Sequence, residues 1–380
     1  MRKINYVKLG NVCRVVSGST PKKSNTEYWG GDIPWITPAE IDNAAHYVWD
    51  TERHITELGV EKASLKELPV GTVLLSSRAP IGKVAITKTP MFCNQGFKNL
   101  ICSDQVLNEY LYRYLRANTA RLQSCGRGAT FKELSKKDVE NIILPLPSIS
   151  CQKNIVSKLE SIDNVILCLN RLLELFNDLV KSRFVEMFGG FEKRTLVGDL
   201  CNCIVPGRDK PKSFSGETPW ITTDDLIDGG ITYFSKSGLG LSDEEMEQVH
   251  ARIIPKDSVL MTCVGRLGIC SIAGCDLVAN QQLHSFLCDL DSINNTFLMY
   301  QLKTSKKYML ENAKSVTVQY MNKKTCNSIP IACPPLSLQQ EFADFVHQVD
   351  KLKFETQQSI EKLQMLYDSL AQEYFAPEGD

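Results

Sequence analysis

The sequence predicts an α+β fold made of two tandem copies of one unit, in which a mixed module is followed by a long helix. The first observation behind this is internal repetition, because the tetrapeptide PWIT at residues 34–37 returns at residues 219–222. The second is a long heptad pattern of apolar residues after the first module. The third is length, because 380 residues are enough for two or three domains with separate cores.

The repeat extends along the whole chain. Further markers recur in the same order: residues 73–82 at 259–268, Asn94-Gln95 at Asn280-Gln281, and Lys136-Lys137 at Lys323-Lys324. Their displacement drifts only from 185 to 187 residues, which is the signature of a duplicated structural unit. We therefore expect modules over residues 1–150 and 191–337, and long helices over residues 151–190 and 338–380.

The modules themselves have the pattern of short strands and short helices. Residues 70–86 are rich in Val, Ile and Leu but are interrupted by glycines and a proline, which favours strands joined by turns over a single helix. Residues 259–273 have the same pattern. Apolar residues return every three or four positions over residues 110–120 and 296–310, which predicts helical segments there.

A regular apolar seam predicts the first long helix. From Ile155 to Val180 apolar residues alternate steps of four and three, through Leu159, Ile162, Ile166, Leu169, Leu173 and Phe176. A seam of more than three heptads indicates a helix that packs along its length against another helix. Ser150 lies where an N-cap is expected, and two glycines at residues 189–190 mark the end.

The second long helix has a less regular seam. Ser337, with a glutamine three residues later, has the pattern of a capping box. Lys353 and Thr356 fall at seam positions where the first copy is apolar. Either these polar residues stay in the seam and fix its register, or the helix rotates locally and Leu352 and Phe354 pack instead.

Because both helices belong to one chain and alternate with the modules, we expect an antiparallel coiled coil in a pseudo-two-fold arrangement, with one module at each end. At ~1.5 Å per residue, the ~38 residues from 151 to 188 would measure roughly 57 Å. One turn of a DNA duplex is ~34 to 36 Å, so such a pair of helices could hold two modules at half-sites one turn or more apart.

Composition excludes several classes of protein. No apolar run approaches the ~18 to 20 residues of a membrane-spanning helix, so we expect a soluble protein without a membrane partner. The 14 cysteines have irregular spacing, without a CxxC pair or a signal peptide, which favours reduced thiols in the cytoplasm.

The charge is unevenly distributed along the chain. Residues 1–150 carry 20 basic and 14 acidic residues, whereas residues 339–380 carry 3 and 9. The net charge of −1 disfavours a uniform coat of nucleic acid, so any DNA binding depends on local clusters of charge. An acidic helix is repelled by phosphates within ~8 to 10 Å, so the second long helix should face solvent or another protein.

One segment in each copy has the composition of a phosphate-binding loop. Residues 17–24 (SGSTPKKS) and 206–212 (PGRDKPK) combine small or hydroxyl-bearing residues with basic ones. Such side chains suit phosphate oxygens, although a solvated loop has the same composition. The candidate contacts here are Ser19, Thr20, Lys22, Lys23, Arg208, Lys210 and Lys212.

Further candidates lie at the predicted turns. Arg78 lies beside Lys83, and Arg266 is its approximate counterpart in the second copy. An arginine here can bind guanine or a phosphate, or be exposed without a partner. The flexible basic stretch 126–132 adds Arg127 and Lys132. Lys98 and His284, which closely follow the repeated amides, complete the candidate contacts at this place in each copy.

The repeated PWIT and Asn-Gln pairs supply the remaining candidates. We expect Trp35 and Trp220 in the core rather than stacked on bases. Thr37 and Thr222 follow them, each with an acidic residue three positions later, a pattern that also caps helices. The amides of Asn94-Gln95 and Asn280-Gln281 can read adenine or hold backbone in place, and Gln95 and Gln281 are taken as candidate contacts.

No catalytic or metal-binding constellation is evident. The sequence lacks a G-x-x-x-x-G-K-[ST] loop, an HExxH motif and the Asn/Asp-Pro-Pro-Tyr tetrapeptide of methyltransferases. The five histidines lack metal-ligand spacing. Ser19 and Lys22 match S-x-x-K, but its companion motifs are missing. We therefore predict no catalytic residues, no metal and no cofactor.

The chain resembles the specificity subunit of type I restriction-modification systems over essentially its whole length. The first copy carries the resemblance in GSTP (18–21), YWGGDIPWIT (28–37), SRAPIGK (77–83), NQGF (94–97) and LPLP (144–147). The second copy matches more loosely, since it keeps PWIT and Asn-Gln but has VGRLG at residues 264–268.

This resemblance implies that each module is a target recognition domain reading one half of a split, asymmetric site in double-stranded DNA. The long helices would set the length of the unread spacer and dock two modification subunits, which bring S-adenosylmethionine and methylate adenine. Restriction subunits would add ATP-driven translocation and cleavage. The chain itself would be a non-catalytic, cofactor-free, cytoplasmic subunit.

Two other functions stay open from the residues alone. One is a nuclease or methyltransferase whose motif has drifted, which assays of the purified chain for nicking and methyl transfer would reveal. The other is a coiled-coil interaction protein without a DNA role, whose binding to duplex would lack the steep salt dependence of phosphate contacts.

Overall fold

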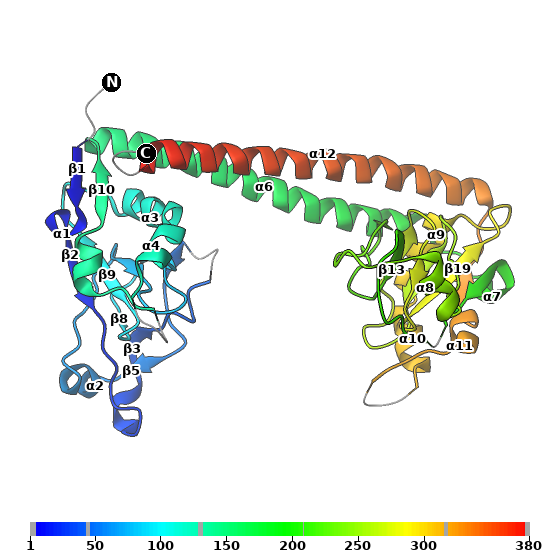
Figure 1. Cartoon of the computed structure of the whole chain (residues 1–380), viewed down its shortest axis with the longest axis horizontal. Helices are drawn as coiled ribbons and strands as arrows, with labels where there is room; N and C mark the ends of the chain where they lie inside the picture. Colours follow the sequence, from blue (N-terminus) through cyan, green and yellow to red (C-terminus); the bar gives the residue numbers. More distant parts are fainter. Residues whose placement is uncertain (1–4, 43–45, 128–131, 208, 315–317, 377–380) are drawn as a thin grey trace. The chain divides into compact units, whose positions relative to one another are not determined.

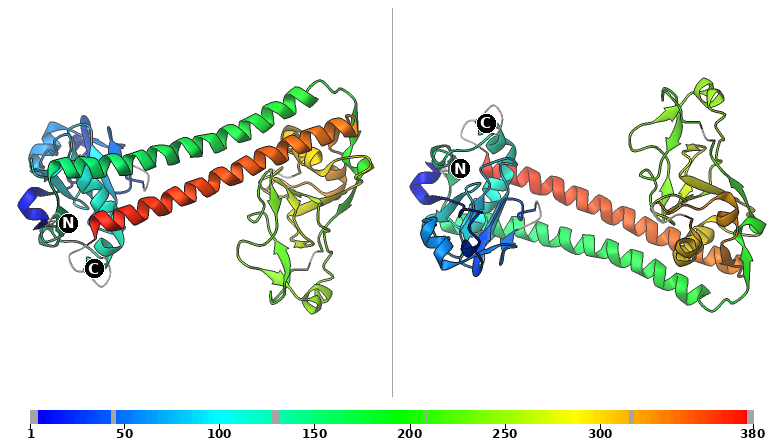
Figure 2. Two further views of the ribbon diagram at one scale, coloured as in Figure 1. Left: turned by 90° about the horizontal axis from the view of Figure 1, so that it is seen from above. Right: turned by 90° about the horizontal axis from the view of Figure 1, so that it is seen from below.

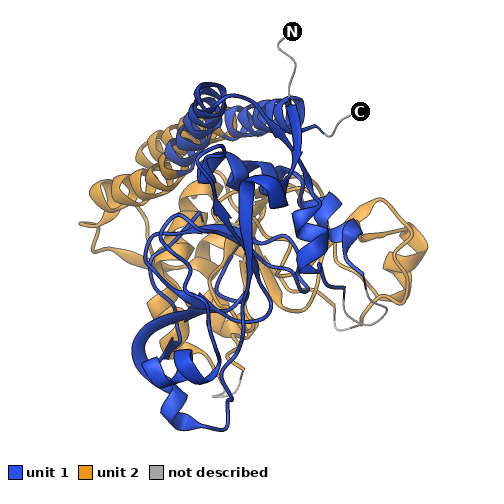
Figure 3. Ribbon diagram, turned by 90° about the vertical axis from the view of Figure 1, so that its left-hand side faces the viewer, with its two compact units in different colours: residues 1–170, 357–380 blue, residues 171–356 orange. Residues whose placement is uncertain are grey.

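The computed structural model describes residues 5–42, 46–127, 132–207, 209–314 and 318–376 (Figure 1). The chain forms two compact units (Figure 3). Unit 1 comprises residues 1–170 and 357–380, and unit 2 comprises residues 171–356. Each unit therefore contains one module together with a part of both long helices.

Unit 1 is built on three sheets. The largest has the strand order β2-β9-β6-β7-β4, the second has the order β5-β3-β8, and β1 pairs with β10. The strands of the large sheet are β2 (Cys13–Ser17), β9 (Lys98–Cys102), β6 (Val73–Leu75), β7 (Val84–Thr87) and β4 (Tyr47–Val48). The others are β5 (His54–Ile55), β3 (Trp29–Ile36), β8 (Phe92–Cys93), β1 (Asn5–Lys8) and β10 (Ile143–Leu146).

Short helices connect these strands. They are α1 (Leu9–Val12), the 3₁₀ helix η1 (Thr26–Tyr28), α2 (Glu57–Lys62), α3 (Asn108–Ala117), α4 (Thr119–Cys125) and α5 (Lys136–Glu140). The long helix α6 (Ile149–Phe188) follows β10 and continues into unit 2.

Unit 2 repeats this topology strand for strand. Its sheets have the orders β12-β19-β16-β17-β14, β15-β13-β18 and β11-β20. The strands are β12 (Cys201–Ile204), β19 (Leu283–Cys288), β16 (Val259–Thr262), β17 (Cys270–Ala273), β14 (Ile231–Thr232), β15 (Gly240–Leu241), β13 (Thr218–Ile221), β18 (Val278–Ala279), β11 (Arg194–Leu196) and β20 (Pro330–Ala332). The helices are α7 (Val197–Leu200), α8 (Asp243–Gln248), α9 (Asn295–Thr304), α10 (Lys306–Asn312), α11 (Lys323–Asn327) and α12 (Leu336–Phe375). The predicted α+β architecture with two tandem copies is confirmed.

The large sheet of each unit is buried on both faces, which explains its continuous apolar strands. Val73 and Leu75 of β6 face the core formed with α3 and the long helices, whereas Leu74 between them faces a second core next to the smaller sheet. This is the alternation that a strand imposes on its side chains. In unit 2, Met261 and Leu260 of β16 divide between two cores in the same way.

Glycine makes the turn that joins the central strands in both units. Gly82 between β6 and β7 has a φ of 94°, and Gly268 between β16 and β17 has a φ of 78°. A side chain is strongly disfavoured in this left-handed region. The predicted strands over residues 70–86 and 259–273 are thus confirmed, together with the turns between them.

The apolar seam of α6 is confirmed residue by residue. Every seam residue from Ile155 to Val180 is buried or half-buried, and most residues between them are exposed. Within unit 1, Ile155 and Leu159 pack with Ala371 and Phe375 of α12. In the described part of the chain, no helix is both long enough and apolar enough to cross a membrane.

Within each unit the two long helices lie side by side and run in opposite directions (Figure 2). In unit 1, Lys158 of α6 lies over Tyr374 of α12. In unit 2, Arg183 near the end of α6 forms a 3.0 Å ion pair with Glu341 near the start of α12. The aromatic rings of Phe184 and Phe342 also pack there, with centroids 5.2 Å apart.

The polar stretch of the second seam stays in the seam. Thr356 is buried and its hydroxyl donates to the carbonyl of Leu352, whereas the side chains of Leu352 and Phe354 are 46% and 63% exposed. The alternative of a local rotation of α12 is therefore wrong. The side chain of Lys353 is half-buried, and its amine pairs with Asp350 at 3.1 Å.

Both long helices begin earlier than the sequence predicted. Ser148, rather than Ser150, precedes the first turn of α6, and its hydroxyl accepts a hydrogen bond from the Cys151 amide at 3.4 Å. The predicted capping box at Ser337 is wrong, because Ser337 lies inside α12. The carbonyl of Pro335 instead accepts hydrogen bonds from the amides of Leu338 and Gln339.

Candidate nucleic-acid interface

In unit 1 the candidate residues lie on loops that the large sheet brings together. The loops after β2, β6 and β8 meet the segment before α5 through main-chain hydrogen bonds. The Ser19 amide donates to the Cys93 carbonyl, the Ser77 amide donates to the Gly96 carbonyl, and the Leu134 amide donates to the Ser77 carbonyl, at 2.7 to 3.0 Å. Segments that are distant in the sequence thus form one loop cluster.

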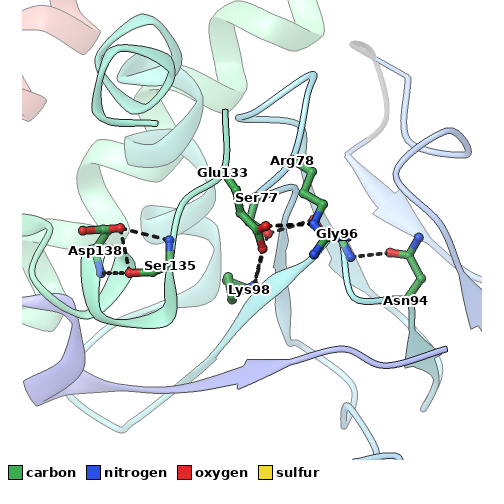
Figure 4. Close-up of polar contacts among 8 residues, drawn as sticks. All are labelled: Ser77, Arg78, Asn94, Gly96, Lys98, Glu133, Ser135 and Asp138. Carbon is green, nitrogen blue, oxygen red and sulfur yellow. Dashed lines mark hydrogen bonds and ion pairs between the residues drawn. The ribbon is translucent and has the colours of Figure 1, made fainter. Parts of the chain in front are cut away.

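Glu133 is the centre of this cluster (Figure 4). Its carboxylate lies 3.0 Å from Nε of Arg78 and 3.4 Å from Nζ of Lys98. Arg78 is about half exposed, whereas Lys98 is only 7% exposed and also lies 3.4 Å from the Ser77 hydroxyl. Two of the candidate cations are therefore already paired inside the unit.

A second group of charges surrounds the start of α5. Ser135 and Asp138 form a reciprocal capping box, and the hydrogen bonds from Ser135 hold the pKa of Asp138 below its usual value (Figure 4). Asp138 also lies 3.6 Å from Arg127, whose side chain is 84% exposed. The open pocket here is lined by Lys98, Arg127, Lys136, Lys137, Glu133 and Asp138, a set with excess positive charge.

The hydroxyl-rich loop after β2 is fixed at its start and exposed at its lysines. The Ser19 carbonyl accepts from the indole nitrogen of buried Trp35 at 3.2 Å, and the Thr20 hydroxyl donates to the side chain of Gln95. Lys22 and Lys23 are exposed. The structure thus brings five of the predicted contacts together on this loop and its neighbour: Ser19, Thr20, Lys22, Lys23 and Gln95. The predicted core position of Trp35 is confirmed.

Thr37 and Thr222 are each held by the acidic residue three positions later. The Thr37 amide and hydroxyl donate to Glu40, and those of Thr222 donate to Asp225, at 2.7 to 2.9 Å. No helix starts here in the described residues, so the pattern closes a turn instead of capping a helix. The same carboxylates accept the amides of Glu52 and Lys236, which ties a distant loop to each turn.

The remaining residues of unit 1 divide between structural and exposed positions. Lys83 is half-buried and donates to the Pro38 carbonyl at 3.0 Å, whereas Lys132 is exposed. The Asn94 side chain accepts from the Gly96 amide at 2.9 Å, and Asn280 accepts from Gln282 at 3.1 Å. These two asparagines therefore hold backbone in place, while the neighbouring Gln95 and Gln281 are exposed.

In unit 2, Lys210 and Lys212 are exposed, and Arg208 lies outside the described residues. Arg266 is 76% exposed and pairs with Asp224 at 3.1 Å. In unit 1 an isolated antiparallel β-bridge pairs Arg78 with Glu133. The corresponding β-bridge of unit 2 pairs Val264 with Tyr320. The structural counterpart of Arg78 is therefore Val264, and the predicted equivalence with Arg266 is wrong by two residues.

His284 lies inside unit 2. It is 4% exposed, and its Nδ1 is 3.3 Å from the sulfur of Cys203. Burial, together with the charge of Lys323, lowers the pKa of His284 to about 4, so its ring is neutral at pH 7. Its counterpart in the ladder of unit 1 is Lys98.

The two loop clusters thus differ at matched positions. The set Ser77, Arg78, Lys98 and Glu133 of unit 1 corresponds to Cys263, Val264, His284 and Tyr320 of unit 2. Charged pairs in one unit are replaced by apolar and neutral groups in the other. Among the described residues, no group of three or more His, Cys, Asp or Glu side chains is arranged to hold a metal.

The acidic partners of the candidate cations are not among the residues predicted from the sequence. Glu133 and Asp138 together pair with Arg78, Lys98 and Arg127. The S-x-x-D pattern at residues 135–138 is sufficient to predict the capping box from the sequence. Glu133 gave no such signal, because its partners lie 35 and 55 residues away in the chain.

A family model described as the type I restriction modification DNA specificity domain matches the chain twice, over residues 1–175 and 190–365. The specificity subunit of the type I restriction enzyme MjaIX from Methanocaldococcus jannaschii is 40% identical over 188 residues, which is 49% of this chain and 44% of that protein. The first curated relatives are matched over less than half of their own length.

Solved structures resemble the whole chain. One comes from work on complex assembly and conformational transition of a type I restriction-modification system, with a TM-score of 0.66, 20% identity and coverage of 99% of both chains. Another is the S subunit of a type I system from M. genitalium, with a TM-score of 0.54, 14% identity, and coverage of 99% and 98%. Both likenesses show the fold.

Proposed function

Because the chain belongs to the family of type I restriction-modification DNA specificity domains, we propose that its two units read the two halves of one bipartite DNA site. The observation that carries this proposal is the double family match on two units with the same topology. A duplicated recognition unit suits a site with two separate half-sites.

The loop cluster around Glu133 is the proposed reading surface of unit 1. Exposed Lys22, Lys23, Arg127 and Lys132 would contact phosphates, which position a protein without specifying sequence. Arg78 is half exposed, and exchange of its Glu133 partner for a guanine edge would supply a base contact. Lys98 is buried and would contribute indirectly, by holding the carboxylate of Glu133 in place.

The proposed site is asymmetric. At matched positions unit 2 offers Val264 and Tyr320 in place of Arg78 and Glu133. A guanidinium and an aliphatic side chain favour different base edges, since the first suits guanine N7 and O6 and the second suits a thymine methyl group. Exposed Lys210, Lys212 and Arg266 are the proposed phosphate contacts on this half, joined by Thr222 and Gln281 at the neighbouring turns.

The long helices are the proposed spacer and docking element. Each has 40 residues, and large apolar side chains on their outer faces are exposed, among them Leu167, Val185, Phe354 and Met365. Exposed apolar residues on helices suit a protein partner. The net acidic character of residues 339–380 disfavours DNA there. The partners proposed are two modification subunits, with restriction subunits joining through them.

The chain is proposed to supply recognition, and its partners are proposed to supply chemistry. The test is to assay methyl transfer and nicking with the purified chain alone, and then with modification subunits and S-adenosylmethionine. We expect neither activity alone and adenine methylation at one bipartite sequence in the complex. Methyl transfer or nicking by the chain alone would instead support an enzyme.

DNA binding is tested separately, on the chain with its modification subunits. Affinity for duplex should fall steeply with salt because phosphate contacts release counterions. An interaction protein that lacks a DNA role would show no duplex binding of this salt-sensitive kind. Mapping the methylated adenines in the host genome would then give the two half-sites.

A further inference from the structure

Cysteines lie opposite one another at matched positions in the two units. Cys13 of β2 is the ladder partner of Cys102 of β9, and Cys201 of β12 is the ladder partner of Cys288 of β19. The second pair follows the first by 188 and 186 residues, so both belong to the same place in the repeat. Other strand cysteines face different residues: Cys203 faces Phe286, and Cys270 faces Met261.

The hydrogen bonds of the ladder identify both pairs as non-hydrogen-bonded positions. The Ser103 amide donates to the Val12 carbonyl at 2.9 Å, one step beyond Cys13 and Cys102. The Asp289 amide donates to the Leu200 carbonyl at 3.3 Å, one step beyond the second pair. At such positions the Cα atoms are about 4.5 Å apart and the side chains approach most closely. A disulfide needs about 4.4 to 6.8 Å, so the backbone already has a suitable spacing.

The thiols of each pair lie on the same face of the sheet, and one thiol of each pair is partly exposed. Both cysteines of each pair belong to the same core cluster, and the neighbouring thiol raises the pKa of Cys13 and of Cys288. Cys13 and Cys201 are 7% exposed and pack into the main core of their units, whereas Cys102 and Cys288 are half-buried. A small oxidant can therefore reach one thiol, with the second thiol held beside it.

We propose that each unit carries a redox-active dithiol, Cys13 with Cys102 and Cys201 with Cys288, which a low-molecular-weight disulfide converts into a cross-strand disulfide. The thiolate of the half-buried cysteine attacks the oxidant and releases one reduced thiol. The thiolate of its partner then attacks the protein sulfur of the mixed disulfide and releases the second. Two protein thiols are oxidised, one disulfide is reduced to two thiols, and the two protons pass to the departing thiolates.

The reaction is expected to be slow and to leave the proposed reading surface in place. The neighbouring thiol and burial raise the pKa of Cys13 and of Cys288, so these two side chains carry little thiolate at neutral pH. In unit 1 the dithiol lies at one end of the β2–β9 ladder, and Ser17 pairs with Lys98 at the other end. The new bond would therefore act on stability, by linking strands that are far apart in sequence.

The test uses the full chain, equilibrated with oxidised glutathione until the thiol count is constant. After acid quench, denaturation and alkylation, peptide mapping should recover Cys13–Cys102 and Cys201–Cys288 as disulfides, and a reductant should reverse both. Exposed Cys125 and Cys168 serve as internal controls and should carry glutathione. The oxidised chain should unfold roughly 5 to 10 °C higher than the reduced chain.

Single variants separate the two sites and guard against a folding defect. Cys102→Ser should abolish the bond of unit 1 and leave that of unit 2 intact, Cys288→Ser should do the reverse, and Cys203→Ser should keep both. The proposal is overturned if Cys13 and Cys102, or Cys201 and Cys288, remain free thiols at the plateau. It is equally overturned if the half-buried cysteines end as stable glutathione adducts, or if other pairings dominate.

Discussion

The guanidinium of Arg113 lies 2.6 Å from the carboxylate of Asp163 and 3.1 Å from the hydroxyl of Tyr367. Arg113 belongs to α3, Asp163 to α6 and Tyr367 to α12, so one buried side chain of the module holds both long helices within unit 1. At the matched place in unit 2, Tyr300 packs against Phe184 of α6 and Phe342 of α12. An ionic contact in one unit thus corresponds to an aromatic contact in the other.

Removing the carboxylate should destabilise unit 1. Asp163→Ala leaves the Arg113 charge buried without its ionic partner, and we expect the free energy of unfolding to fall by about 2 kcal/mol. This is less than the ~3 to 5 kcal/mol for a fully buried pair, because Asp163 is half exposed. Chemical denaturation measures the loss, and hydrogen exchange of the α3 amides assigns it to unit 1. The matched control is Asp178→Ala, whose exposed partner Lys181 predicts a change within about 0.5 kcal/mol. Equal losses in the two variants would contradict this account.

Buried glutamines attach the starts of both long helices to their modules. Gln152 accepts from the Leu107 amide and donates to the carbonyls of Gln105 and Pro147, all at 2.9 Å. Gln339 accepts from the Asn294 amide and donates to the Pro334 carbonyl, also at 2.9 Å. Gln152→Leu and Gln339→Leu should each lower the free energy of unfolding of one unit by about 2 to 3 kcal/mol, since buried backbone groups lose their partners. The exposed Gln357→Leu is the control in denaturant melts, and a comparable loss there would refute a specific role for the two amides.

The stability of unit 2 should depend on the titration of His284. Its pKa is about 4 in the folded chain and about 6.5 when unfolded, so the unfolded chain binds more protons between these values. The free energy of unfolding should therefore be highest above pH 6.5 and should fall by up to about 3 kcal/mol as the pH approaches 4. Denaturation at a series of pH values measures this slope. His284→Gln should flatten it in unit 2, and an unchanged slope would show that other groups cause it.

Lysines of the loop after β2 should contribute to the salt dependence of DNA binding. Lys22→Gln with Lys23→Gln should reduce the slope of log K against log salt by about 1 to 2, since each lost phosphate contact removes roughly 0.9. Titration of the complex with duplex at several salt concentrations gives the slope. Lys181→Gln on α6 removes a charge that is already paired with Asp178 and should leave the slope unchanged. If the double variant keeps the parental slope, this loop does not contact phosphates.

Periodicity made the repeat and the long helices predictable, whereas long-range contacts decided the rest. The seam from Ile155 to Val180 depends only on spacing along one helix, and it was predicted in full. The predicted start of α6 is wrong because Ser148 and Ser150 are equally good caps by sequence. At the actual start, Gln152 forms hydrogen bonds with residues more than 40 positions away, which the local sequence does not indicate.

The candidate site was predictable as a set of loops but not as a set of exposed side chains. Lys98 and His284 are predicted from the sequence as DNA contacts, yet both are buried. Each lies at the first positions of a strand that pairs with a distant strand, so its burial depends on the whole sheet. Lys22, Lys23, Lys210 and Lys212 are exposed, since their loops are rich in proline and polar residues.

The spacing of the two half-sites tests the proposed function most directly. One extra heptad in both α6 and α12, after residues 170 and 356, lengthens each helix by about 10 Å, roughly three base pairs of duplex. Methylated adenines would be mapped for the complexes formed by the parental and the lengthened chains. We predict that both half-site sequences stay the same and that the unread spacer between them grows. A lengthened chain that methylates at the original spacing, or at altered half-site sequences, would contradict the proposal that paired helices set the distance between two reading units.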